Sequence, residues 1–235
     1  MHMLSEKDIS DKENYENTIL EWYERCLPSK DEKIRDVASL SLFNYYFRKA
    51  DYEMALNYTK YFSGENSRRK FMEAMVYSKN GKKNEAYKAY EELLFSRCNS
   101  LNYTLAHLCM LYREDNNHDM ANKLVNISIA ISKYFDMIEP HYLELEIATW
   151  EKDVARTEEA VRNCLDSFGK ATNFMKSPLY QHMDFNDLGD DEKSYLELDS
   201  EDNRKRFIES CKKDKRFDYM RGNKLWEKLI FSDGN

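Results

Sequence analysis

The stretch from Gly81 to Leu93, GKKNEAYKAYEEL, decides the fold of this chain. Glycine tolerates left-handed backbone, so Gly81 predicts the end of one helix. Behind it, Ala86, Tyr90 and Leu93 recur at the three- and four-residue spacing of a second helix. The stretch therefore predicts a helical hairpin that turns at Gly81.

The same pattern recurs on both sides of this hairpin. A tyrosine and an alanine each return at intervals of 31 and 35 residues: Tyr46, Tyr77 and Tyr112; Ala55, Ala86 and Ala121. In the third copy, Asn116 stands at the helix end. A fourth, looser copy is expected at Trp150, Ala160 and Cys164. We expect the small alanine where two helices of a hairpin cross closely, and the aromatic residue in the gap against the next hairpin.

These intervals resemble the tetratricopeptide repeat (TPR), a helix-turn-helix unit of about 34 residues. The resemblance predicts an all-α fold, a TPR-like helical-hairpin solenoid with a C-terminal helical cap. The alternative is an irregular helical bundle in which the spacing is accidental. We expect a polar leader over 1–13, the repeats over 14–169 and the cap over 170–235, because a stack of repeats has an apolar end that needs covering.

The predicted element ends follow local signals. The first helix is expected over 14–27 and stops at Pro28, and Asp31 caps the next helix. In the cap, Ser177 precedes Pro178 at a helix start. Two further helices are expected there, one after Ser200 and a short last one around Trp226.

Composition supports helices and excludes several classes of protein. The 235 residues include only 6 Gly and 3 Pro, too few for the many tight turns of a sheet-rich fold. The net charge of −7 offers no strong attraction to nucleic acid. Five scattered cysteines without a C-x-x-C pair are typical of reduced thiols and predict a cytoplasmic protein. No apolar run approaches 18 residues, so we expect no membrane association.

Longer words in the sequence resemble one group of proteins. They are LEWYERCLPSKDEKIRDVA (20–38), LFNYYFRKADYEMA (42–55), YSKNGKKNEAYKAYEELLFS (77–96), IATWEKD (147–153), KSPLYQHMDF (176–185) and GNKLWEKL (222–229). With these words the chain resembles the C-terminal sensor region of bacterial transcriptional regulators that begin with a helix-turn-helix of the xenobiotic-response-element (XRE) type. The resemblance covers residues 15–231 and carries no catalytic motif.

One departure limits what the resemblance implies. Regulators of this group carry DNA-binding helices ahead of the repeats, and nothing before Asn14 can form a helix-turn-helix with a basic recognition helix. DNA would be contacted only through a domain not present in this chain. More distant relatives of this architecture sense peptides in bacterial quorum signalling. The resemblance therefore implies a non-catalytic sensor or interaction domain that binds a peptide or protein partner; the alternative is a dimerisation or scaffold module without a small ligand.

The candidate binding surface is the inner face of the first helix of each hairpin. Six residues are expected to form this peptide groove: Asn44, Phe47, Phe71, Met75, Met110 and Arg113. An amide both donates and accepts hydrogen bonds to a peptide backbone, and a guanidinium pairs with a carboxylate in a forked geometry. The alternative is that Phe71, Met75 and Met110 are ordinary core residues.

No catalytic or metal-binding constellation stands out in the sequence. Phosphate-cradling, nucleotide-binding, zincin and nucleophile-elbow motifs are missing, and the five histidines are scattered. We therefore expect no enzyme, no cofactor and no metal. An enzyme of unrecognised type is the remaining alternative, which a polar pocket with perturbed titrating groups would favour.

Overall fold

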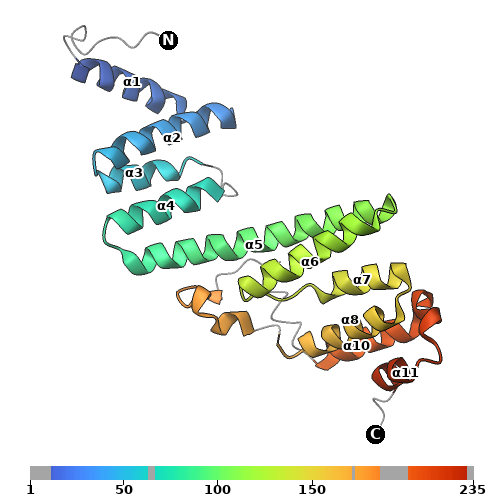
Figure 1. The fold of residues 1–235 in the computed structure, drawn as a ribbon. Helices are drawn as coiled ribbons and strands as arrows, with labels where there is room; N and C mark the ends of the chain where they lie inside the picture. Colours follow the sequence, from blue (N-terminus) through green and yellow to red (C-terminus); the bar gives the residue numbers. More distant parts are fainter. Residues whose placement is uncertain (1–11, 63–66, 171–172, 186–200, 232–235) are drawn as a thin grey trace. The chain divides into compact units, whose positions relative to one another are not determined.

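The computed structural model describes residues 12–62, 67–170, 173–185 and 201–231 (Figure 1). Every regular element in these residues is an α-helix or a 3-10 helix, and no strand occurs among them. The all-α prediction is confirmed. The predicted leader lies outside the described residues up to position 11, and the first helix already begins at Lys12.

The chain divides into two compact units between Leu93 and Leu94. The first unit contains α1 (Lys12–Cys26), α2 (Glu32–Arg48), α3 (Tyr52–Thr59), α4 (Ser67–Lys79) and the beginning of α5 (Lys83–Glu114). The second contains the rest of α5, α6 (His118–Tyr134), α7 (His141–Glu151), α8 (Val154–Ser167), η1 (Asn173–Lys176), η2 (Pro178–Tyr180), α10 (Glu201–Lys213), η4 (Lys215–Met220) and α11 (Lys224–Phe231). The division between units thus falls inside α5. The predicted boundary between repeats and cap at 169–170 stays a prediction.

The length of α5 departs from the expected hairpins. Separate hairpins require a break between the helix that begins behind Gly81 and the helix that ends at Asn116, but one helix of 32 residues spans both. No glycine or proline occurs between Gly81 and Pro140, so no local signal stops the helix.

Five helix ends in the described residues share one turn geometry. At each, the residue in left-handed backbone is followed by an amide that donates to a carbonyl five residues back, as in a Schellman motif. The left-handed residues are Ala50, Gly81, Asn116, Asp136 and Lys152; the carbonyls belong to Tyr46, Tyr77, Tyr112, Ser132 and Ala148. The predicted ends at Gly81 and Asn116 are confirmed. The same turn forms at the other three positions without a glycine or an asparagine.

The fourth copy of the pattern is shifted from its predicted register. The turn sequence places Ala148 where the earlier copies carry tyrosine, and the position of the crossing alanine falls on Thr157. Trp150 and Ala160 were expected there, so this assignment is wrong by two and three residues. Thr157 is fully buried, as Ala55 and Ala121 are. A small residue is therefore kept at the position, although it is not an alanine.

The alanine crossing yields a test of the packing. Ala121 lies fully buried where α6 meets α5, and its carbonyl accepts a 3.5 Å hydrogen bond from Cys109 Sγ. We expect Ala121→Leu to lower the free energy of unfolding by about 1–3 kcal/mol through overpacking. Urea unfolding measures the change. The control is Ala130→Leu on the exposed side of the same helix, which should change stability by less than about 0.5 kcal/mol.

The tail beyond α8 packs as two separate parts. Helices α10 and α11 bury Ile208, Trp226 and Ile230 in a cluster with Val161 and Cys164 of α8. Residues 173–185 instead pack beside α5 and the connection from α6 to α7. The tail is therefore not one continuous layer on α8. Its role as the cap of a repeat stack stays a prediction.

Local signals at the helix starts agree with the structure. The carboxylate of Asp31 accepts from the amide of Lys33 at the start of α2. Ser177 Oγ accepts from the amide of Leu179 ahead of η2, with Pro178 in the first helical position. Both predicted caps are confirmed. Ser200, the third predicted cap, lies outside the described residues.

Candidate functional site

The first unit holds four of the six residues predicted for the peptide groove. Asn44 is exposed on α2, and Phe47 is half-buried in the apolar cluster of α2, α3 and α4. On α4, Met75 is half-buried, and the 41% exposed ring of Phe71 contacts Tyr90 edge-on at 6.0 Å. Asn44 and Phe71 are thus exposed, whereas Phe47 and Met75 are half-buried. This distribution agrees with a groove and also with the alternative that the apolar residues belong to the core.

The second unit holds Met110 and Arg113, and both are already engaged. Met110 packs in the cluster of α5, α6 and α7. Arg113 Nη1 lies 3.8 Å from Met110 Sδ and 3.4 Å from Glu146 Oε2. Glu146 also accepts from Arg216 at 2.7 Å. A ligand carboxylate would have to compete with Glu146 for Arg113. A single groove that joins the residues of both units stays a prediction.

The second unit contains an apolar cavity of about 330 Å³ that the sequence analysis did not predict. It lies between α5, the connection from α6 to α7, the start of α7 and η1. Its apolar lining includes Phe95, Tyr103, Met137, Ile138, Tyr142 and Phe174. Its volume is at the lower end of the range for small-ligand sites. None of the six predicted groove residues lines it.

Three polar side chains line the apolar cavity, and they differ in how well they are satisfied. Asn102 is fully engaged, because it donates to Ser132 Oγ and accepts from Ser128 Oγ, both at 2.9 Å. This pair of bonds fastens α5 to α6. The amide nitrogen of Asn99 is buried and has no hydrogen-bond partner among the residues that the structure describes. The third polar residue is Glu139.

A second cavity of about 570 Å³, the polar cavity, adjoins the first. The two share Met137, Ile138, Glu139 and Phe174 as lining residues. The polar cavity is also lined by charged residues of both signs: Lys133, Asp136, Asp166, Lys170 and Lys176. Its charges largely balance, so it has no strong preference for the sign of a ligand.

The segment 173–185 contributes Phe174 to the lining of both cavities, and its contacts with α5 and the end of α6 position it. Phe174 stacks on Phe95 with ring centroids 5.2 Å apart. Tyr180 donates a hydrogen bond of 2.7 Å to the carbonyl of Phe135. Ser177 donates one of 2.7 Å to Asp136. The segment is therefore positioned by packing and by hydrogen bonds to the end of α6.

The polar cavity does not assemble a nucleophile with a base. Both serine hydroxyls are donated elsewhere, Ser177 Oγ to Asp136 and Ser167 Oγ to the carbonyl of Cys164. Burial lowers the pKa of His141, which favours a neutral ring at pH 7. Neither hydroxyl is hydrogen-bonded to this ring, whereas nucleophilic catalysis needs nucleophile and base in contact.

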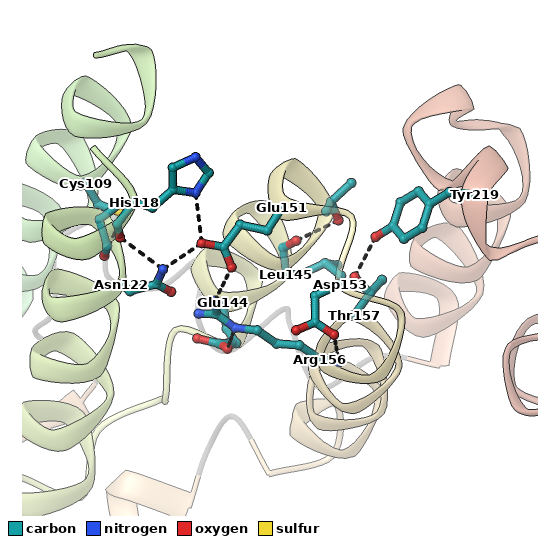
Figure 2. Close-up of polar contacts among 12 residues, drawn as sticks. Cys109, His118, Asn122, Glu144, Leu145, Glu151, Asp153, Arg156, Thr157 and Tyr219 are labelled. Carbon is teal, nitrogen blue, oxygen red and sulfur yellow. Dashed lines mark hydrogen bonds and ion pairs between the residues drawn. The ribbon is translucent and has the colours of Figure 1, made fainter. Parts of the chain in front are cut away.

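A separate polar network joins α6, α7 and α8 (Figure 2). Arg156 donates through Nε to Glu144 and through Nη1 to Glu151 Oε2, the latter at 2.7 Å. The other oxygen of Glu151 accepts from Asn122 at 2.7 Å and lies 3.1 Å from His118 Nδ1. The side chains of Arg156, Glu144 and Glu151 are about one-fifth exposed, that of His118 is half exposed, and none of the network residues lines either cavity. The network therefore has a structural role, fastening three successive helices.

The network also fixes protonation states. Burial alone would raise the pKa of Glu151, but hydrogen bonds from Asn122 and His118 and the charge of Arg156 bring it below its ordinary value. The His118 ring stacks on Trp150, with centroids 3.8 Å apart. The pKa of the Glu151 carboxyl is thus perturbed, but by its hydrogen bonds and its ion pair within the network, and Glu151 lines neither cavity.

The described residues contain neither a cluster of metal-ligating side chains nor a membrane-spanning helix. In residues 12–62, 67–170, 173–185 and 201–231, no group of three or more His, Cys, Asp or Glu side chains is arranged to hold a metal ion. No helix in the same ranges has both the length and the apolar character needed to span a bilayer. Comparison with models of protein families, with curated proteins and with solved structures gave no match.

Sequence reasoning missed the cavity for a physical reason. Its residues come from α5, from 137–142 and from 174, so they share no periodicity that a sequence pattern could reveal. One signal was present. The word KSPLYQHMDF at 176–185 lies outside the repeats and contains Leu179, Tyr180, Met183 and Phe185, which pack in one cluster with Phe174 of the cavity lining.

Proposed function

We propose that this chain is a non-catalytic helical-repeat interaction domain that binds a peptide through the apolar cavity of its second unit. The observation that carries the proposal concerns Asn99, which lines that cavity. Its amide nitrogen is buried and has no hydrogen-bond partner in the described residues. An unsatisfied buried donor costs about 1–3 kcal/mol, and a ligand carbonyl would supply its missing acceptor. A peptide offers one carbonyl at every residue.

The repeated turns support a TPR-like architecture for this domain. Of the five carbonyls that accept Schellman bonds, those of Tyr46, Tyr77, Tyr112 and Ala148 are 31, 35 and 36 residues apart, close to the length of that repeat; the fifth, that of Ser132 at the end of α6, falls between two of them. Repeat proteins of this kind use extended surfaces for binding. The continuous helix α5 and the shifted fourth copy are departures from a regular array.

The regulatory context of the proposal rests on the resemblance to XRE-type regulators alone. In that context the chain is the sensor region, and a separate helix-turn-helix domain contacts DNA. A cytoplasmic location agrees with the cysteines, all five of which are free thiols.

A dimerisation module is the second candidate, and one observation favours it. Leu101, Leu108 and Leu111 on α5 are 45%, 38% and 57% exposed. Their spacing of seven and three residues places them on one stripe of the helix, as in a coiled-coil seam. A second copy of the chain could cover this stripe. Sedimentation equilibrium of the parent and of Leu108→Glu distinguishes this candidate from a monomeric peptide binder.

The test of the first proposal is binding of peptides to the whole chain. A positional-scanning library of hexapeptides, measured by calorimetry, identifies the residues preferred at each position. We expect Asn99→Ala to weaken the best peptide by about 3- to 10-fold, the value of one neutral hydrogen bond. The same variant should keep or raise the thermal stability, because it removes an unsatisfied amide.

Two control variants test the groove that the sequence predicts. Asn44→Ala and Arg113→Ala remove the polar ends of the six-residue surface without touching the cavity. If these two variants lose binding and Asn99→Ala does not, the site lies on the predicted groove and the cavity assignment is wrong. If no hexapeptide pool binds and the parent is a dimer that Leu108→Glu dissociates, dimerisation replaces peptide binding.

A further inference from the structure

The apolar cavity has an asymmetric charge. Glu139 is the one ionisable acid in its lining, and no lysine, arginine or histidine lines it. Burial, and then the proximity of Tyr103, raise the pKa of Tyr142 above its already high ordinary value, so the phenol of Tyr142 stays neutral at pH 7. At neutral pH the lining therefore carries one negative charge.

The negative charge of Glu139 is not neutralised by the protein. The ion-pair partner that the described residues give it is His141, whose Nε2 lies 3.8 Å from Glu139 Oε2. Burial holds the pKa of His141 below its ordinary value, so its ring is uncharged at pH 7. No lysine of the adjoining polar cavity reaches ion-pair distance of Glu139 in the described residues. A ligand can therefore supply the missing positive charge.

The walls of the cavity suit the same charge. Four aromatic residues line it: Phe95, Tyr103, Tyr142 and Phe174. The faces of aromatic rings are negative and attract ammonium and guanidinium groups within about 6 Å, most strongly where water is excluded. Aromatic residues beside one carboxylate therefore favour a cation as the occupant, whereas an anion would meet repulsion from the carboxylate.

We infer that the apolar cavity takes an organic cation, an alkylammonium or guanidinium group on a short apolar body, with Glu139 as its counter-ion. This inference deepens the proposed function, on which it rests for the idea that a ligand enters the cavity. Because Asn99 offers a hydrogen-bond donor in the same wall, a lysine or arginine residue of a peptide satisfies both features. Its side chain supplies the cation and its main chain the carbonyl.

The experiment compares three small probes that share one ring and differ in charge. Benzylamine, benzyl alcohol and benzoate are titrated calorimetrically into the whole chain at pH 7.5. We expect benzylamine to bind at least about 10-fold more tightly than benzyl alcohol, and benzoate more weakly than either. Equal binding of the alcohol or of benzoate, or no binding of benzylamine at millimolar concentration, overturns the inference.

Matched variants identify the counter-ion. Glu139→Gln keeps the size and hydrogen-bonding capacity of the side chain, and it should weaken benzylamine by about 10-fold while leaving benzyl alcohol unchanged. Asp166→Asn removes a carboxylate that lines only the polar cavity and should leave both affinities unchanged. Thermal melts of both variants verify the fold. An unchanged benzylamine affinity in Glu139→Gln rejects Glu139 as the counter-ion and overturns the inference.

A further experiment with peptides distinguishes a peptide side chain from a small molecule as the source of the cation. It also tests the peptide-binding proposal and the cation inference separately. Acetyl-Ala-Arg-Ala-amide is compared with the peptide in which citrulline, the neutral isostere, replaces arginine. Preference for arginine that is lost in Glu139→Gln supports a peptide source. Peptide binding that depends on Asn99 but not on charge overturns the cation inference and leaves the proposed function standing. Benzylamine binding that depends on Glu139 without any peptide binding supports the inference and rejects the peptide function.

Discussion

Tyr180→Ala is expected to lower the free energy of unfolding by about 3–5 kcal/mol, the largest effect we expect from a single change in the described residues. Tyr180 is completely buried and its ring lies edge-on to Phe95, with centroids 5.5 Å apart. Its hydroxyl donates to the carbonyl of Phe135. Alanine would leave a ring-sized void and an unsatisfied carbonyl. Urea unfolding followed by circular dichroism measures the loss.

Two controls separate the causes of this loss. Tyr180→Phe keeps the ring and removes only the hydrogen bond, so it should cost about 1 kcal/mol. Tyr134→Ala truncates a tyrosine that is 83% exposed on α6 in the same unit, and it should change stability by less than about 0.5 kcal/mol. A Tyr180→Ala protein as stable as Tyr134→Ala would mean that 173–185 does not pack against α5 in solution.

Arg156→Met is expected to lower the free energy of unfolding by about 2–3 kcal/mol. Methionine retains the apolar stem but leaves the carboxylates of Glu144 and Glu151 without their cation. All three side chains are about one-fifth exposed, so the cost lies below the roughly 3–5 kcal/mol of a fully buried pair. The control is Arg162→Met on the same helix: the Arg162 side chain is 53% exposed, so its pair with Glu158 is worth less than about 1 kcal/mol.

The pH dependence gives a second measurement on the Arg156 variant. The pKa of Glu151 is lower in the folded protein than its ordinary value, so the network stabilises the fold most above the unfolded pKa of about 4.3. That contribution is lost as the pH falls through the folded pKa. The difference in stability between parent and variant should therefore shrink as the pH is lowered below about 4.3. A difference that is constant from pH 7 to pH 3 would show that the loss comes from packing and not from charge.

The hairpins and their ends could be predicted from the sequence because their causes are local. Gly81 and Asn116 tolerate left-handed backbone, and Asp31 and Ser177 accept hydrogen bonds from amides two residues ahead. Such effects act over a few residues and leave a readable pattern. The fourth copy was misplaced because Lys152 carries no such preference. Its left-handed conformation is imposed by the packing of α7 and α8 on either side of it.

The candidate groove shows the limit of periodicity. The three- and four-residue spacing predicts which residues share a helix face, but it does not say what each face meets. The sequence predicts that Arg113 pairs with the carboxylate of a ligand, but in the structure it pairs with Glu146, 33 residues away along the chain. Periodicity does not reveal the apolar cavity for the same reason, since Glu139 and Phe174 come from segments without a repeat.

The sequence by itself therefore determined the all-α class, the turns at Gly81 and Asn116 and the buried alanines at positions 55 and 121, since these follow from backbone preferences and from spacing along one helix. Only the tertiary structure decided which buried polar groups find partners. Asn102 obtains two from α6, while the amide nitrogen of Asn99, three residues earlier on α5, obtains none among the described residues. The two asparagines are chemically identical in the sequence. What distinguishes them is the position of distant side chains, which leaves the buried amide nitrogen of Asn99 without a partner in the described residues.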